Sequence, residues 1–206
     1  MDQVRQTPRC DAYTLGAELI QGYPIRDRYG NHTTIHEMKD RLKKMTTDFN
    51  SNNLVGTAGE YFVCAELCRI GYLALLTPKN NPLFDVVASK QNGSKSVVIQ
   101  VKTRSIRNTQ GWKLGKDITL KKNNPDLFVA LVNLEENGMP EIFIYEYDIL
   151  AERVQNNYTN YIETPKRDGT RKKEVGFRWH DLKLFTDDDH SRRNNWLPII
   201  NALENT

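Results

Sequence analysis

Two runs rich in valine and isoleucine, separated by an Asn-Gly pair, constrain the fold of this chain more than any other feature. The sequence reads FDVVAS, then KQNGSK, then SVVIQVKT. Because Asn-Gly favours a tight turn that matches the twist of paired strands, this segment predicts an antiparallel β-hairpin centred on Asn92 and Gly93. Asp85 and Gln100 each lie seven residues from the turn. The register therefore places them opposite each other.

Three polar side chains interrupt these apolar runs. Asp85 begins the first run, and Gln100 and Lys102 lie near the end of the second. Residues two apart point to the same face of a strand, so Gln100 and Lys102 share a face while Val101 points to the other. Side chains directly opposite each other have Cβ atoms about 5 Å apart. We expect Asp85, Gln100 and Lys102 to converge, although cross-strand polar pairs on a solvated surface would give the same pattern.

A carboxylate, an amide oxygen and a lysine at one place suit the hydrolysis of a phosphodiester bond. Mg²⁺ prefers oxygen ligands and keeps several waters. Asp85 and Gln100 can supply two such ligands, and the backbone carbonyl of Val101 a third. A metal bound there polarises the phosphate and lowers the pKa of a bound water. Lys102 can orient that water or stabilise developing negative charge.

A further carboxylate, Glu60, lies in GTAGEYFVCAELCRIGY. Apolar residues cover most of the circumference of this predicted helix, so we expect it to be largely buried. Thr57 and Glu60 have the spacing of a capping box. Alternatively, Glu60 points at the sheet and adds an acid near the metal. Gly56 and Gly59 allow the start of the helix to approach the sheet closely.

These segments, in this order, resemble the PD-(D/E)XK nuclease superfamily. The matching stretches are GTAGEYFVCAELCRIGY, NPLFDVVAS and SVVIQVKTR, within residues 54 to about 150. The resemblance is strongest to small bacterial members related to Holliday-junction resolvases, restriction endonucleases and homing endonucleases. It implies an Mg²⁺-dependent deoxyribonuclease, with Mn²⁺ able to substitute. It further implies Asp85 and Gln100 as metal ligands, Lys102 as the catalytic lysine and Glu60 as the acid that assists the metal.

The sequence departs from the family pattern at two positions. Phe84 precedes Asp85 where the family has proline, and Gln100 replaces the more frequent acid. A neutral amide binds Mg²⁺ more weakly than a carboxylate does. An alternative is therefore a catalytically weak or inactive module of the same fold that binds nucleic acid or a partner protein. A nuclease that acts on RNA is a third alternative, because the motif does not distinguish the two sugars.

Positive charge is concentrated next to the predicted hairpin. The net charge of the chain is only +3, but residues 90 to 122 contain nine Lys or Arg residues and one acid, Asp117. This surface is either simply solvated or binds phosphates. Trp112 either stacks on a base or packs in the core. The predicted nucleic-acid contacts are Thr103, Arg104, Arg107, Trp112, Lys113 and Lys116, with Arg171 and Lys172 from the loop TPKRDGTRKK.

We expect the partner to be double-stranded or branched DNA. Cleavage of both strands usually needs two active sites, which favours a homodimer. Neither His180 nor His190 has an evident partner in the sequence, so neither is given a role.

The rest of the pattern predicts an α/β fold with a restriction-endonuclease-like core, in which helices flank a mixed central β-sheet. Strands are expected at YLALL, DLFVALVNL and EIFIYEYDI, with a short strand at DITL and an edge strand at EVGFRWHDL. Asp148 is expected to cap a helix, and NNWLPIINAL to form the last one. A capping box at Thr34 starts a helix that runs to Phe49. We therefore expect an N-terminal helical arm over residues 1–50 and the nuclease domain with a C-terminal extension over 51–206.

The cellular location follows from features that the sequence lacks. No apolar run has the length of a membrane span, and the first residues have no hydrophobic core of a signal peptide. Three scattered cysteines form no disulfide framework. Cys64 and Cys68 are expected as thiols in the core. We therefore expect a cytoplasmic protein with no membrane partner.

Overall fold

The computed structural model describes residues 25–26, 32–33, 52–78, 81–135 and 138–205. The chain divides into two compact units, Met1–Phe49 and Asn50–Thr206. In the first unit, β1 (Ile25–Arg26) and β2 (His32–Thr33) form an antiparallel pair. The helix predicted between Thr34 and Phe49 lies outside the described residues.

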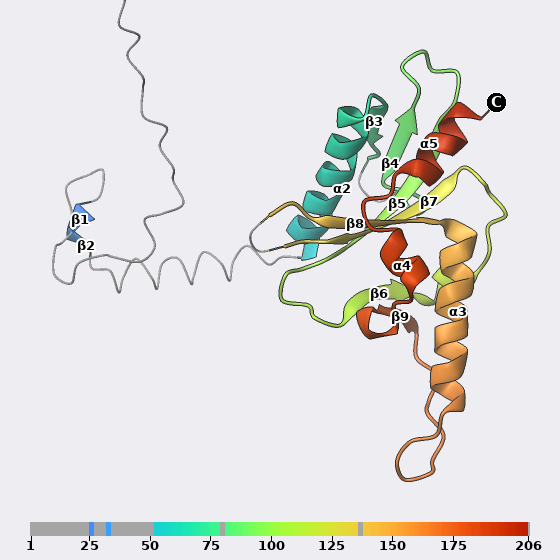
Figure 1. Cartoon of the computed structure of the whole chain (residues 1–206). Helices are drawn as coiled ribbons and strands as arrows, with labels where there is room; N and C mark the ends of the chain where they lie inside the picture. The colour runs from blue at the N-terminus through green and yellow to red at the C-terminus, as the bar shows by residue number, and fades with distance from the viewer. Residues whose placement is uncertain (1–24, 27–31, 34–51, 79–80, 136–137, 206) are drawn as a thin grey trace, which may run out of the picture. The chain divides into compact units, whose positions relative to one another are not determined.

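The second unit is built on a five-stranded mixed sheet with the strand order β3-β4-β5-β7-β8 (Figure 1). Only the central pair, β5 and β7, is parallel, and the other neighbours are antiparallel. The predicted mixed α/β architecture is therefore confirmed. The strands are β3 (Leu73–Leu76), β4 (Val86–Ser89), β5 (Ser96–Arg104), β7 (Leu127–Asn133) and β8 (Glu141–Glu146).

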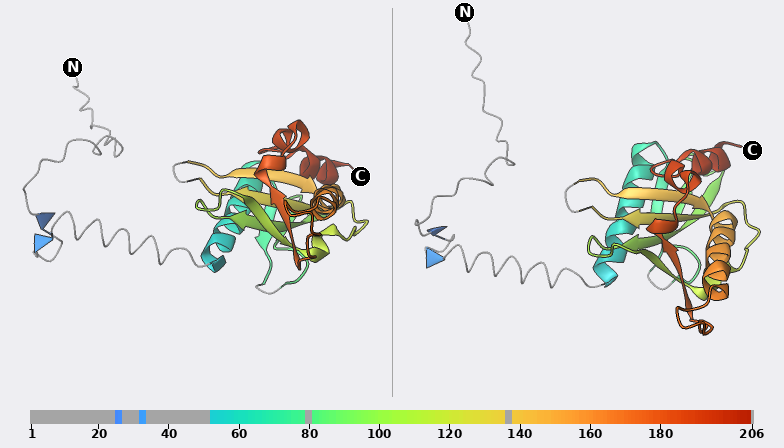
Figure 2. Two further views of the ribbon diagram at one scale, coloured as in Figure 1. Left: turned by 90° about the horizontal axis from the view of Figure 1, so that it is seen from below. Right: turned by 60° about the horizontal axis from the view of Figure 1, so that its bottom comes forward.

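Helices cover both faces of this sheet (Figure 2). On one face, α2 (Asn52–Arg69) and α5 (Leu197–Glu204) enclose the first core. On the other face, the second core lies beneath α3 (Tyr147–Glu163) and a separate two-stranded sheet of β6 (Gly111–Gly115) and β9 (Phe177–Asp181). No helix in the described part of the chain is both long and apolar enough to cross a membrane. The short helices are η1 (Lys116–Thr119), η2 (Leu182–Leu184) and α4 (Asp187–Ser191).

Strand β5 separates the two cores because its side chains alternate between the two faces. Val97, Ile99 and Val101 are buried in the first core, and Val98 packs against the second. The near-continuous burial of β7 on both faces is typical of the central strand of a covered sheet.

Helix α2 lies close to β5 at a single glycine. A Cβ atom added to Gly59 would overlap with the side chain of Thr103, whereas one added to Gly56 would meet nothing within 4 Å. The expected close approach is therefore confirmed for Gly59 and wrong for Gly56.

The prediction that α2 is largely buried is wrong. Only one stripe of the helix, which includes Val63 and Leu67, is fully buried. Tyr61 and Cys68 are exposed and Cys64 is half-buried, so Cys68 is not the expected core thiol. The physical reason is that α2 is an outer layer, with the sheet on one side only.

Two local predictions on the β6 side of the sheet also need correction, and one strand there was missed. The DITL segment forms part of the 3-10 helix η1 rather than a strand, and the preceding strand β6 was not predicted. Asp148 does not cap α3, which begins one residue earlier. Instead, its carboxylate accepts hydrogen bonds from the backbone N–H groups of Lys122 and Asn123, at 2.7 and 2.9 Å. The edge strand at β9 is confirmed, and it pairs with β6.

A buried polar network connects side chains from β8, β9, α3 and α4. Asp189 is fully buried and forms an ion pair with Arg153, with 2.6 Å between Oδ2 and Nη1. The Tyr145 hydroxyl donates to Asp189 Oδ1 at 2.9 Å and lies 3.2 Å from His180 Nε2. No partner of His180 was evident in the sequence, because only the tertiary fold brings these residues together.

We predict that Gly59→Ala lowers the free energy of unfolding by about 1–3 kcal/mol, because the new methyl group overpacks the contact with Thr103. Urea unfolding checks this. Gly56→Ala is the matched control, and it should stabilise the protein by about 0.5–1 kcal/mol, since alanine is the better helix former and the site is open. Removing the clash in the double variant Gly59→Ala/Thr103→Ala should restore stability. If both single glycine variants behave alike, the close contact is not present.

We also predict that stability falls in mild acid. Burial lowers the pKa of His180 to about 4, while an unfolded histidine titrates near 6.5. The unfolded chain therefore binds more protons between these values, so the free energy of unfolding falls by about 3 kcal/mol as pH drops from 6.5 to 4. Urea unfolding at several pH values measures the slope. His180→Gln should flatten the slope, and the same substitution at the exposed His190 should leave it unchanged.

Candidate active site

The hairpin has the register that its turn predicts. Gly93 has φ of +71°, which L-residues with a side chain seldom adopt, and the strands pair from Ser89 with Ser96 to Val86 with Ile99. The ladder ends there. The backbone N–H of Asp85 donates to the Ile99 carbonyl at 2.9 Å, although Ile99 pairs with Val86 in the ladder. Asp85 thus lies just beyond the end of the ladder, and the predicted pairing of Asp85 directly opposite Gln100 is not part of it.

The carboxylate of Asp85 is held against the neighbouring strand. Its Oδ2 accepts a 2.7 Å hydrogen bond from the backbone N–H of Val101, which belongs to the peptide that joins Gln100 to Val101. The main chain of Asp85 is also fixed from the other side. The N–H of Thr77 donates to the Asp85 carbonyl at 2.9 Å, and the Thr77 hydroxyl donates to the Phe84 carbonyl at 2.9 Å. Asp85 is therefore positioned by both neighbouring strands.

Gln100 and Lys102 line one cleft of about 490 Å³. They lie on the same face of β5 as Val98, as the two-residue spacing predicts. Apolar side chains form much of the wall, with Asp117, Lys122 and Asn124 among the polar ones. The remaining lining residues are Pro82, Leu83, Phe84, Leu114, Gly115, Ile118, Leu127 and Tyr147.

The sequence did not point to three of these polar residues as parts of a site. Asp117 lies on η1, and Lys122 and Asn124 lie in the loop that follows it. The one available signal was that Asp117 is the single acid within the basic segment. Their place at the cleft depends on how the chain crosses from β5 to β7, which no local pattern encodes.

Glu60 lies on α2, which packs on the other side of the sheet. It follows Gly59, which contacts Thr103, the residue after Lys102. Helix α2 covers the face of β5 opposite to Gln100 and Lys102. The capping-box alternative is wrong, because α2 begins at Asn52, well before Thr57. Assistance of a metal by Glu60 stays a prediction.

The oxygen donors at this end of the hairpin fit a hard cation. The described residues contain no cluster of three or more His, Cys, Asp or Glu side chains that could hold a metal ion. Asp85 Oδ2 is bound to the peptide between Gln100 and Val101, two residues that carry an amide oxygen and a carbonyl oxygen. Mg²⁺ is usually bound through one or two carboxylates and keeps several waters. The donor chemistry therefore suits Mg²⁺ or Mn²⁺.

Three of the predicted nucleic-acid contacts are structural instead. Trp112 is only 2% exposed, and its Nε1 donates to the Val132 carbonyl at 3.0 Å, so it cannot stack on a base. Thr103 faces α2 with its hydroxyl buried. Arg104 is half-buried over the Trp112 ring and donates to the Asn108 carbonyl. Burial lowers the pKa of its guanidinium. Packing against neighbouring elements, which sequence does not show, accounts for all three corrections.

The other predicted contacts lie at the surface. Arg107, Lys113, Lys116 and Arg171 are exposed. Lys172 is half-buried, and its ammonium group donates to the Tyr161 carbonyl at 2.9 Å. Their contact with nucleic acid stays a prediction.

Comparisons with known proteins give a distant likeness among solved structures. No family model matches the chain, and no curated protein matches it. Among solved structures, a bacterial homing endonuclease, I-Ssp6803I, is similar with 15% sequence identity and a TM-score of 0.41. The match covers 73% of this chain and 92% of that one.

Proposed function

We propose that this chain is a metal-dependent endonuclease that hydrolyses phosphodiester bonds in DNA, of the restriction, homing or junction-resolving type. One observation carries the proposal. Gln100 and Lys102 face the same cleft, and the carboxylate of Asp85 is hydrogen-bonded to the peptide between Gln100 and Val101. The carboxylate bound to this peptide, and the amide and lysine on the same strand, support the proposal.

The metal-binding role falls to Asp85, with the Gln100 amide oxygen and the Val101 carbonyl as neutral ligands and Glu60 as an assisting acid. When bound, Mg²⁺ or Mn²⁺ would polarise the phosphate and make a coordinated water more acidic. The hydrogen bond from Val101 fixes the Asp85 carboxylate before any ligand arrives. Little reorganisation of this group is then needed in the reaction.

Lys102 supplies the positive charge on the cleft side. Its ammonium group would orient the attacking water or stabilise the charge that develops on the phosphate oxygens. Lys122 lines the same cleft and adds a second cation for the phosphate. The apolar wall that includes Phe84 and Ile118 limits the access of bulk water, which strengthens these electrostatic interactions.

The wider substrate would be double-stranded or branched DNA. Exposed basic residues such as Lys113, Lys116 and Arg171 would contact the phosphate backbone, which positions a nucleic acid without reading its sequence. Two copies of the chain would supply the two active sites that cleavage of both strands requires. A catalytically weak or inactive binding module is the second candidate, and the neutral Gln100 favours it.

Asp85→Asn should abolish cleavage while leaving the fold intact. Asparagine keeps an oxygen that can accept from Val101 N–H but removes the negative charge that binds the metal. We expect the rate of plasmid nicking in Mg²⁺ or Mn²⁺ to fall at least about 100-fold, with an unchanged urea midpoint. Full activity in this variant would exclude Asp85 as the metal ligand.

Lys102→Ala should likewise reduce nicking by about 100-fold or more, because the cation that stabilises the reacting phosphate is lost. Lys95→Ala is the matched control, since Lys95 lies at the other end of the same hairpin and its ammonium group pairs with Asp126. The control should cleave at the wild-type rate. Equal rates in both lysine variants would contradict a role for Lys102.

Gln100→Glu separates the two candidate functions. A second carboxylate should bind Mg²⁺ more tightly, so an active nuclease should need less metal for half-maximal cleavage. Metal titration of the nicking rate measures this. A wild-type chain with no cleavage at any metal concentration, together with a Gln100→Glu variant that cleaves, would instead support the inactive binding module.

A further inference from the structure

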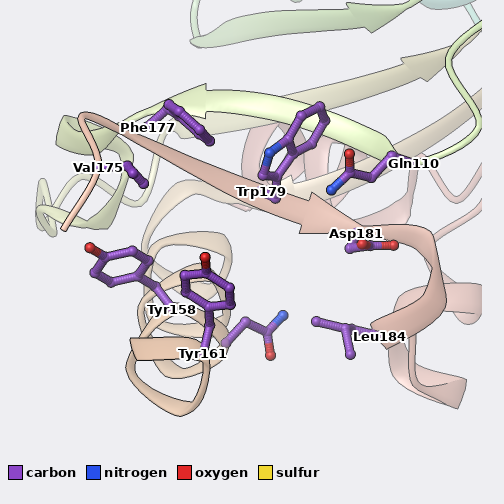
Figure 3. Close-up of a pocket in the computed structure, with 9 residues that line it drawn as sticks. Gln110, Tyr158, Tyr161, Val175, Phe177, Trp179, Asp181 and Leu184 are labelled. Atoms are coloured by element: carbon purple, nitrogen blue, oxygen red, sulfur yellow. The ribbon is translucent and has the colours of Figure 1, made fainter. Parts of the chain in front are cut away.

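A second cavity, of about 350 Å³, lies between the last turns of α3 and strand β9 (Figure 3). Tyr158 and Tyr161 from α3 face Phe177 and Trp179 from β9 across it. Four aromatic rings around a cavity of this size favour a flat, largely apolar ligand. Polar residues line the same cavity: Gln110, Asn157 and Asp181.

Two buried polar groups of this lining have no hydrogen-bond partner among the described residues. They are Nδ2 of Asn157 and the hydroxyl of Tyr158. Most buried polar groups in proteins are hydrogen-bonded, and each exception needs an explanation. Both atoms have almost no accessible surface, so a ligand in the cavity would meet them only after Asn157 or Tyr158 changed rotamer. The carboxylate of Asp181 accepts from the backbone of Lys183 through one oxygen, Oδ1. The lining therefore offers both donors and acceptors.

Cations of the chain itself already lie over three of the four rings. Lys172 Nζ is 4.0 Å from the Tyr161 ring centre, Lys113 Nζ is 4.3 Å from that of Phe177, and the Arg178 guanidinium carbon is 3.4 Å from that of Tyr158. This positive charge disfavours a cationic ligand in the cavity. It favours a flat ligand attached to an anionic group. The loop between α3 and β9 adds exposed cations at Lys166, Arg167, Arg171 and Lys173.

We propose that this aromatic pocket binds an unpaired nucleobase of a DNA strand. The rings would stack on the base, the polar residues would bond to its edge, and the surrounding lysines and arginines would contact the adjoining phosphates. The choice of DNA as the polymer rests on the proposed function. The pocket itself does not depend on catalysis, because its residues are separate from those of the cleft.

Helix α3 sets the spacing between the pocket and the cleft. Tyr147 in its first turn lines the cleft, and Tyr158 and Tyr161 near its end line the pocket. At 1.5 Å per residue, the intervening stretch of helix is about 17–21 Å long. A strand with base-pair spacing would cross that length with on the order of five nucleotides. The substrate inferred from this is a strand with an unpaired base a few nucleotides from the phosphate that is cut, as at a flap or a junction.

Binding without cleavage tests the pocket. The probe is a fluorescein-labelled single-stranded 20-mer, compared with the same strand fully paired, with fluorescence anisotropy measured in EDTA. Tyr161→Ala and Trp179→Ala should weaken single-strand binding by about 5-fold to 150-fold, the range expected for the loss of a stacked base. Binding of the fully paired duplex should change little. Tyr61→Ala is the control, because Tyr61 is an exposed aromatic residue on α2, away from this cavity.

Several outcomes would overturn the proposal. It fails if the wild-type chain binds no oligonucleotide, or if the pocket variants bind the single strand as tightly as Tyr61→Ala does. It also fails if single strand and duplex lose affinity equally, which would indicate phosphate contact alone. Tighter binding of a trimethyl-lysine peptide than of the oligonucleotide would assign the pocket to another ligand class. Circular dichroism melting of each variant confirms that it is folded.

The same measurements distinguish this inference from the nuclease proposal. Single-strand binding is measured in EDTA, where metal-dependent cleavage is switched off, so the binding assay does not depend on catalysis. A chain that binds single strands through the pocket but cuts no DNA supports the pocket and refutes the nuclease. A chain that cuts DNA but is insensitive to Tyr161→Ala and Trp179→Ala refutes the pocket alone.

Discussion

The alternation of side chains along β5 is the constraint on which the fold and the candidate site both depend. Its odd-numbered residues, Val97 to Val101, complete the core under α2 and α5. Its even-numbered residues change from the apolar Val98 to Gln100 and Lys102, which line the cleft. A shift of the strand by one residue would exchange the two faces and bury the amide and the lysine in an apolar core. The core therefore fixes the direction in which the site points.

The parallel pairing of β5 with β7 explains the walls of the cleft. Parallel neighbours cannot be joined by a tight turn, so the chain must cross over between them. Residues 105 to 126 make this crossover and include β6 and η1. The crossover brings Asp117, Lys122 and Asn124 to the cleft opposite β5. The basic segment of the sequence is thus largely the connection that the sheet topology requires.

The two-stranded sheet of β6 and β9 has one face in the second core and another face that lines the aromatic pocket. Trp112 and His180 pair across it and pack in the second core, where His180 meets the network of Tyr145 and Asp189. On β9, Phe177 and Trp179 alternate with the buried Arg178 and His180, and they line the aromatic pocket. The buried network holds the layer in place, and the pocket residues remain open to a ligand.

The sequence by itself determined the hairpin, its register and the shared face of Gln100 and Lys102, because these follow from a local turn and the two-residue period of a strand. It also determined the mixed α/β class. Only the tertiary structure decided the single buried stripe of α2 and the burial of Trp112, Thr103 and Arg104. The tertiary structure also decided which further residues line the cleft and which line the aromatic pocket. The physical reason is that burial and convergence depend on which elements pack together across long sequence separations, and no local period records that packing.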